Sequence, residues 1–66
     1  MYIKKLAKLR KEKGFTQEGL ARKANISYHT IIKIESGRIK NPRVGTLLKL
    51  AEALEVSTDK LLSKEV

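Results

Sequence analysis

Apolar residues recur along this chain at intervals of three and four, the spacing that places side chains on one face of an α-helix. In residues 2–13, Ile3, Leu6 and Leu9 follow this spacing, and lysines occupy many of the positions between them. Gly14 comes next, and glycine tolerates the left-handed conformation that often ends a helix. The pattern predicts a first helix over residues 2–13 with one apolar and one basic face.

Two shorter helical segments follow, with a three-residue turn between them. Thr16 is a typical N-cap for the second helix, whose apolar face consists of Leu20, Ala21 and Ala24. Asn25 stands where the turn requires a positive φ, which asparagine tolerates better than most residues. Ser27 predicts the cap of a third helix, over about residues 27–35. Two helices joined in this way, over about residues 16–36, have the layout of a DNA-reading helix-turn-helix, in which the second helix enters the major groove.

The C-terminal part of the chain begins with a loop and a fourth helix. Residues 37–42 (GRIKNP) begin with glycine and end with proline, which predicts a loop. The fourth helix then runs to about residue 55, along the apolar stripe Leu47, Leu50, Ala51 and Leu54. It begins either from Asn41, with Pro42 in the first turn, or from Arg43, and both starts fit the sequence.

Ser57 predicts the cap of a last short helix that contains Leu61 and Leu62. The five predicted helices, with short loops and no strands or repeats, indicate an all-α fold. At 66 residues, we expect one domain over residues 1–66.

The third helix is predicted to have two different faces. At about 100° per residue, Ile31 and Ile34 share one arc with Ser27 and Glu35, and this arc is the expected buried side. The opposite side holds the candidate base-contacting residues Tyr28, His29, Thr30, Ile32 and Lys33. Imidazole and hydroxyl groups can hydrogen-bond base edges, lysine suits guanine, and apolar side chains can contact a thymine methyl group. The alternative is that this side of the helix is an ordinary solvent-exposed surface. Ile32 argues against this alternative, because an apolar side chain on an outer face needs a binding partner.

Charge is distributed unevenly along the chain. There are 15 Lys and Arg against 7 Asp and Glu, a net charge of +8. Residues 1–45 hold twelve basic and three acidic side chains, a balance of +9, whereas residues 46–66 are at −1. Such a surface attracts nucleic acid, because neutralising phosphates releases counterions. An anionic membrane would also attract it, and the basic first helix could lie on one, but we expect its apolar face to close the core instead.

The composition gives little support to other chemistry. The absence of cysteine excludes disulfides and thiolate metal sites, and with His29 as the only histidine we expect no metal and no cofactor. The serines are better explained as caps and loop residues than as nucleophiles, and no glycine-rich phosphate loop is present. No apolar run approaches the length of a membrane span. We therefore expect a cytoplasmic protein that is not an enzyme and has no membrane or small-molecule partner.

The order of these motifs resembles the lambda-repressor-like helix-turn-helix family, also called the XRE or Cro type. The matching stretches are TQEGLA, I-S near the turn, I-x-x-I-E-x-G, NP, and LLKLAEAL-x-VS-x-D-x-L. The resemblance covers nearly the whole chain and implies a compact five-helix domain. It also implies that Tyr28 and His29 occupy the leading base-reading positions, with Lys33 one turn further along.

The resemblance implies further roles outside the third helix. It implies that Gln17 approaches a phosphate and braces the first residues of the third helix. The implied phosphate-contacting residues are Gln17, Ser36, Arg38, Lys40 and Arg43. It also pairs Arg10 with Glu35 in an internal ion pair, which the sequence independently permits because both residues fall on arcs that are otherwise buried.

Four positions depart from the family pattern. Gly19 stands where a residue such as glutamate is usual, so a full capping box from Thr16 is lost. Asn25 replaces the usual turn glycine, and Arg43 and Gly45 replace a more helix-favouring start of the fourth helix. These departures leave the fold prediction unchanged but put the details of the DNA grip in question.

We expect a sequence-specific binder of double-stranded DNA that acts as a transcriptional regulator and repressor in the cytoplasm, at the nucleoid. Two copies would bind an inverted repeat, as a weak homodimer that forms only on DNA. The alternative is a protein-interaction or antitoxin-type module with only non-specific DNA affinity, for which Leu61, Leu62 and Val66 could supply an apolar patch. Replacing His29 and Lys33 by alanine discriminates the two, because only DNA reading depends on the outer face of the third helix.

Overall fold

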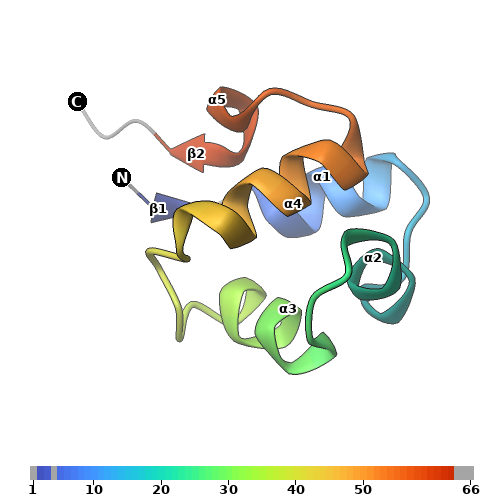
Figure 1. Cartoon of the computed structure of the whole chain (residues 1–66), viewed down its shortest axis with the longest axis horizontal. Coiled ribbons are helices and arrows are strands. Elements are labelled where there is room, and N and C mark those ends of the chain that lie inside the picture. Colours follow the sequence, from blue (N-terminus) through green and yellow to red (C-terminus); the bar gives the residue numbers. More distant parts are fainter. Residues whose placement is uncertain (1, 4, 64–66) are drawn as a thin grey trace.

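The computed structural model describes residues 2–3 and 5–63 of the chain. Its elements, in chain order, are β1 (Tyr2–Ile3), α1 (Leu6–Glu12), α2 (Gln17–Ala24), α3 (Tyr28–Glu35), α4 (Val44–Leu54), α5 (Thr58–Leu61) and β2 (Leu62–Ser63). Within the described residues, the predicted order of five helices and the all-α class are confirmed (Figure 1).

The ends of α1, α2 and α3 follow from the residues predicted to form them. The side-chain oxygens of Thr16 and Ser27 each accept a hydrogen bond from a backbone N–H in the first turn of the helix that follows, at 2.9 and 3.1 Å. Gly14, just beyond α1, has φ of 80°, and Asn25, at the end of α2, has φ of 58°. Both are left-handed conformations, so the sharp turn between α2 and α3 is encoded locally.

The starts of α4 and α5 are less strongly capped. Arg43 is the N-cap of α4 and Val44 its first residue, so the later of the two predicted starts is the one observed. Ser57 lies at the N-cap position of α5, but its hydroxyl makes no capping hydrogen bond, and the prediction that it caps this helix is wrong in that respect. Burial of Leu61, which is fully enclosed, holds this four-residue helix in place instead.

The prediction of no strands is wrong, because β1 pairs with β2 in a short antiparallel ladder. Ile3 lies opposite Leu62, and its N–H donates a hydrogen bond to the carbonyl of Lys40 at 3.1 Å. Helix α1 consequently begins at Leu6 rather than at residue 2. The spacing of Ile3, Leu6 and Leu9 also fits a helix, so periodicity alone could not reveal the extended backbone at Ile3.

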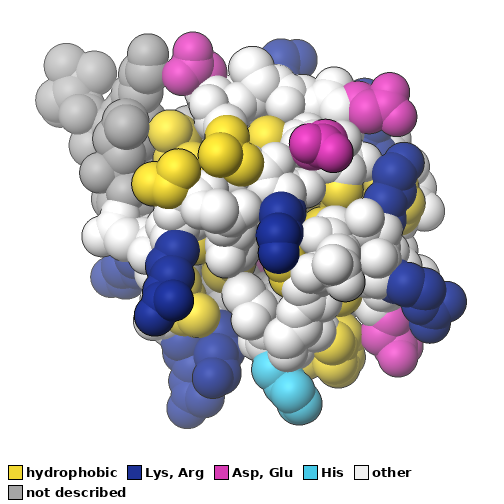
Figure 2. All heavy atoms as spheres, in the orientation of Figure 1, with side chains coloured by type: hydrophobic (Ala, Val, Ile, Leu, Met, Phe, Trp, Pro, Cys, Tyr) yellow, Lys and Arg dark blue, Asp and Glu magenta, His cyan; other side chains and the backbone are white. Residues whose placement is uncertain are grey.

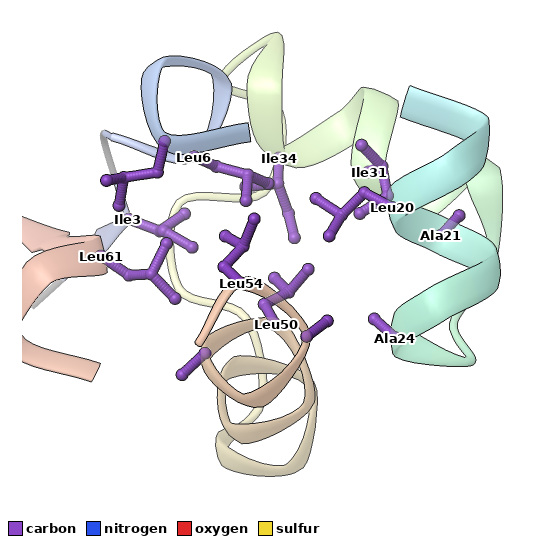
Figure 3. Close-up of a cluster of buried hydrophobic side chains, with 13 residues drawn as sticks. Ile3, Leu6, Leu20, Ala21, Ala24, Ile31, Ile34, Leu50, Leu54 and Leu61 are labelled. Carbon is purple, nitrogen blue, oxygen red and sulfur yellow. The ribbon is translucent and has the colours of Figure 1, made fainter. Parts of the chain in front are cut away.

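The core lies between α2, α3 and α4 and is closed by α1, α5 and β1. Figure 3 shows Leu20 of α2 and Ile31 of α3 close together, with Leu50 of α4 below them. None of these three side chains is exposed to solvent. Because α1 and α2 pack on the inner side of α3, the opposite side of α3 faces out of the molecule (Figure 1).

The apolar face of α1 belongs to the same core. Leu6 and Leu9 are buried, whereas Lys8 and Lys11 on the other face are exposed. The face that a membrane-surface helix would insert into lipid is therefore occupied by protein. In the part of the chain described, no helix is both long and apolar enough to cross a bilayer.

Candidate nucleic-acid interface

The outward face of α3 presents polar side chains without using them to hold the fold. Tyr28, His29 and Lys33 are exposed, and Thr30 and Ile32 are partly covered. The His side chain projects at the lower edge of the molecule in Figure 2, where α3 lies in Figure 1. The tyrosine and histidine rings lie next to each other, with centroids 5.9 Å apart and planes tilted by 50°. All five predicted base-contacting residues therefore lie on one side of the helix or at its margins.

The inward face of α3 is anchored by apolar packing. Ile31 and Ile34 are buried, as predicted from their arc. Ser27 is exposed, so its predicted place on the buried side is wrong. It is the N-cap, with extended rather than helical dihedrals, and the 100° rule does not apply to a residue outside the helix.

Arg10 and Glu35 form the ion pair between α1 and the end of α3. The arginine Nε donates to Glu35 Oε2 at 2.7 Å, and Nη2 donates to Oε1 at 3.2 Å. A third donor, Nη1, binds the carbonyl of Phe15 at 2.8 Å. The two side chains are only 10% and 9% exposed, so the paired geometry compensates for charges that have lost most of their water. The three hydrogen bonds of the Arg10 guanidinium fix α3 against α1 and against the loop before α2.

Gln17 is a second support for the same carboxylate. Its Nε2 donates to Glu35 Oε1 at 3.0 Å from the first turn of α2. The expectation that Gln17 braces the first residues of α3 is therefore wrong, because its partner is the last residue of that helix. Glu35 offers an ionised acceptor, which makes a stronger hydrogen bond than a neutral group. A role for the amide on a DNA phosphate stays a prediction.

The remaining predicted phosphate contacts lie in the loop after α3 and at the start of α4. Ser36, Arg38, Lys40 and Arg43 are all exposed. In Figure 2, Lys and Arg side chains gather at the lower left, over the loop between α3 and α4. The hydroxyl of Ser36 donates to the carbonyl of Lys33 at 3.2 Å, so its proton is used within the protein. Backbone hydrogen bonds from Ile39 to the carbonyl of Lys33 and from Ile3 to the carbonyl of Lys40 fix the middle of the loop to α3 and to β1.

A hollow of about 310 Å³ separates α3 from the start of α4. It is lined by Thr30, Ile39, Asn41, Pro42, Arg43 and Thr46. The sequence analysis considered Asn41 only as a possible helix start and as part of the NP match, and it gave Thr46 no role. Their position beside α3 adds an amide and a hydroxyl to the candidate interface.

The apolar patch of the alternative protein-binding function is smaller than expected. Leu61 is fully buried and Leu62 is half-buried. Val66 lies outside the described residues. Leu61 therefore completes the core. No group of three His, Cys, Asp or Glu within the described ranges is placed to hold a metal ion.

Comparison with known proteins places this geometry in context. A family model described as "Helix-turn-helix" matches residues 6–61. The chain is 44% identical over 57 residues to the "Uncharacterized HTH-type transcriptional regulator y4dJ" of Sinorhizobium fredii (strain NBRC 101917 / NGR234), across 86% of this chain and 73% of that protein. It is 39% identical over 62 residues to the "HTH-type transcriptional regulator ImmR" of Bacillus subtilis (strain 168), across 94% of this chain but only 48% of the relative.

A solved structure supports the same grouping. The chain superposes with a TM-score of 0.86 and 34% identity on SinR, a master regulator for biofilm formation that was crystallised in complex with DNA. The match covers 89% of this chain and 94% of that chain. Both the arrangement of the helices and about a third of the residues are thus shared with a protein solved on DNA.

Proposed function

This chain belongs to the lambda-repressor-like, XRE-type helix-turn-helix family, and from that premise we propose that it binds double-stranded DNA sequence-specifically and regulates transcription. The observation that carries the proposal is the contrast within α3. Its inner face is anchored by Ile31, Ile34 and the ion pair of Glu35, while its outer face projects polar side chains into solvent. A helix held this firmly can present its outer face to the major groove in a fixed orientation.

Base reading is assigned to the outer face of α3, which carries Tyr28, His29, Thr30, Ile32 and Lys33. Lysine can donate to the two acceptors of guanine, and the imidazole and hydroxyl groups can bind other base edges. Tyr28 and Ile32 can contact thymine methyl groups. This mixture of donors and apolar groups supports a defined site rather than uniform binding to any sequence.

The phosphate backbone is assigned to residues on either side of the helix-turn-helix, namely Gln17, Ser36, Arg38, Lys40 and Arg43. Contacts to phosphates set the register of a protein on DNA, and contacts to bases provide specificity. The hydrogen bonds that tie residues 39 and 40 to α3 and β1 support this role, because they hold Arg38 and Lys40 beside the reading helix.

The biological setting follows from the same assignment. We propose one DNA-binding domain over residues 1–66, two copies of which occupy an inverted repeat about one helical turn apart. The bound pair acts as a repressor by covering promoter DNA, in the cytoplasm at the nucleoid. No catalytic step forms part of this function.

The test is selection from a random duplex-DNA library near physiological salt. The wild-type chain should enrich a defined site, and a His29→Ala, Lys33→Ala variant should lose that enrichment. Lys60→Ala is the matched control: it also removes one lysine charge, but from α5, and should retain the site. Salt-sensitive binding without enrichment, common to all three proteins, would contradict the proposal and leave the protein-interaction alternative.

A further inference from the structure

Two large aliphatic side chains stand in solvent on α4. Val44 and Leu48 are one turn apart and are 69% and 54% exposed. In Figure 2, hydrophobic side chains form a patch on the upper half of the molecule, over α4. The core-facing stripe of this helix is a different one, and it carries Leu50, Ala51 and Leu54. The exposed pair is therefore not needed to complete the core.

Charge along α4 follows the same exposed stripe. Glu52 lies two turns after Val44 and one turn after Leu48, so it continues the row toward the C-terminal end. The opposite end begins with exposed Arg43, which makes no side-chain capping bond, and the first turn contains no acidic residue. The helix dipole adds positive character at that first turn and negative character at the last. The stripe thus runs from a positive end through an apolar middle to a negative end.

We infer that a second copy of this chain docks on this stripe, with the two α4 helices antiparallel about a twofold axis near Leu48. In this register Leu48 contacts Leu48 of the second copy. Glu52 then lies against the first turn of the second α4, near its Val44 and the positive end of its helix dipole, and Arg43 stays available for the phosphate contact proposed above. Such an isologous contact matches the apolar middles and pairs the opposite charges twice.

Gly45 supports this choice of occupant. It lies in the first turn of α4, and glycine favours a helix less than alanine does. A Cβ built on this residue would meet no atom within 4 Å, so the protein's own packing does not require glycine. In the antiparallel pair, the missing side chain lets Glu52 of the second copy approach the backbone amides of this turn.

The contact is small, and its size sets the strength of the pair. Two aliphatic side chains and their charged neighbours bury far less than the roughly 1,200–2,000 Å² of a stable protein interface. The pair should be weak in solution and form readily only when DNA holds two copies close together. In this respect the inference rests on the proposed function, because it is DNA binding that brings the two copies together. The stripe lies on a different part of the surface from α3, so the pair leaves both α3 helices free to bind DNA (Figures 1 and 2).

The first test uses the absence of cysteine from the 66-residue sequence. In Leu48→Cys, two copies should place their thiols within reach of each other at the twofold axis. Oxidised glutathione should then oxidise the two thiols to one disulfide between the copies, and is itself reduced to two molecules of glutathione. Lys11→Cys, an exposed position on α1, is the matched control and should cross-link much more slowly. Equal rates for the two variants would overturn the inference, and this readout requires no DNA.

The second test separates pairing from folding. Val44→Asp places an acid in the first turn of α4, where it favours the helix, yet it opposes Glu52 of the second copy. Sedimentation equilibrium should show concentration-dependent pairing of the wild type that Val44→Asp and Leu48→Glu abolish, with thermal unfolding by circular dichroism as the folding control. A wild-type chain that stays monomeric at millimolar concentration, or variants that still pair, would overturn the inference.

The third test measures binding to duplexes that carry one or two copies of the selected site. Leu48→Glu should bind a single site within about twofold of wild type but lose at least about tenfold in affinity on the inverted repeat. Equal losses on both duplexes, or none, would overturn the inference while leaving the proposed function intact. If the wild type selects no site, the proposed function fails, and the cross-linking experiment still decides the inference.

Discussion

The two faces of α3 differ in how completely their polar groups are paired inside the protein. On the inner side, the Glu35 carboxylate accepts three hydrogen bonds, two from Arg10 and one from Gln17. On the outer side, His29 and Lys33 extend into solvent. The inner side is thus specified by folding, whereas the outer side is specified by whatever the helix binds.

This comparison separates two kinds of evidence. An inner residue leaves a measurable defect in stability when it is removed, because a buried group loses its partner or its packing. An outer residue should leave stability almost unchanged and alter only recognition. Substitutions on the inner face should therefore lower the free energy of unfolding. Substitutions on the outer face should leave that free energy almost unchanged and alter DNA selection.

The largest effect is expected for Glu35→Ala. It leaves the Arg10 guanidinium buried without its counter-charge, and breaking such pairs typically lowers the free energy of unfolding by about 3–5 kcal/mol. Urea denaturation followed by circular dichroism measures the loss, with Lys33→Ala as the control on the same helix. A loss below about 1 kcal/mol would mean that Arg10 finds water or another acceptor, and that the anchor is not the ion pair.

The neighbouring isoleucines provide a matched pair for the second prediction. Ile31 is fully buried and Ile32 is only partly covered. Ile31→Ala should cost about 2–5 kcal/mol of unfolding free energy through the cavity it leaves. Ile32→Ala should cost under about 1 kcal/mol but weaken binding to the selected DNA site, by loss of a contact to a thymine methyl. Equal losses of unfolding free energy in the two variants would contradict the prediction that only Ile31 belongs to the buried face of α3.

Gln17→Ala tests the support beneath the ion pair and should have a smaller effect. Loss of one hydrogen bond to a charged acceptor should lower the unfolding free energy by about 1–2 kcal/mol. Glu18→Ala, at the exposed neighbouring position, is the control and should be near neutral. If Gln17→Ala is equally neutral but impairs DNA binding, the amide serves phosphate contact alone.

The smallest effect on stability is expected for the outer face itself. The His29→Ala, Lys33→Ala variant should unfold within about 0.5 kcal/mol of wild type, because both side chains are exposed surface residues. Thermal and urea unfolding of the purified variant measure this directly. Destabilisation above about 1 kcal/mol would show that the outer face contributes to folding and that its loss of DNA selection has a second cause.

Much of the helix-turn-helix could be predicted from the sequence because its signals are local. Thr16, Asn25 and Ser27 each fix the backbone through a side chain or a dihedral preference that acts within three residues. The buried arc of α3 follows from helical periodicity in the same way, and it identified Ile31 and Ile34.

The errors arise where partners are distant in sequence. Ile3 fits helical spacing, but its backbone is held by residues 40 and 62, which no local pattern reveals. The brace from Gln17 reaches Glu35 rather than the start of α3, because helix packing decides which carboxylate is within range. The predicted apolar stripe of α4 left out Val44 and Leu48, and the packed structure shows that both are exposed.

The strand β1 links the loop between α3 and α4 to the C-terminal strand β2 through backbone hydrogen bonds. It joins the backbone of the Lys40 loop to β2, and its Ile3 side chain also belongs to the core. The loop that carries Arg38 and Lys40 is therefore held twice, to α3 through Ile39 and to β1 through Lys40. Weakening the β1–β2 ladder removes only the second of these restraints, so it should loosen the phosphate contacts of the loop while the packed position of α3, and with it the base preference, stays the same.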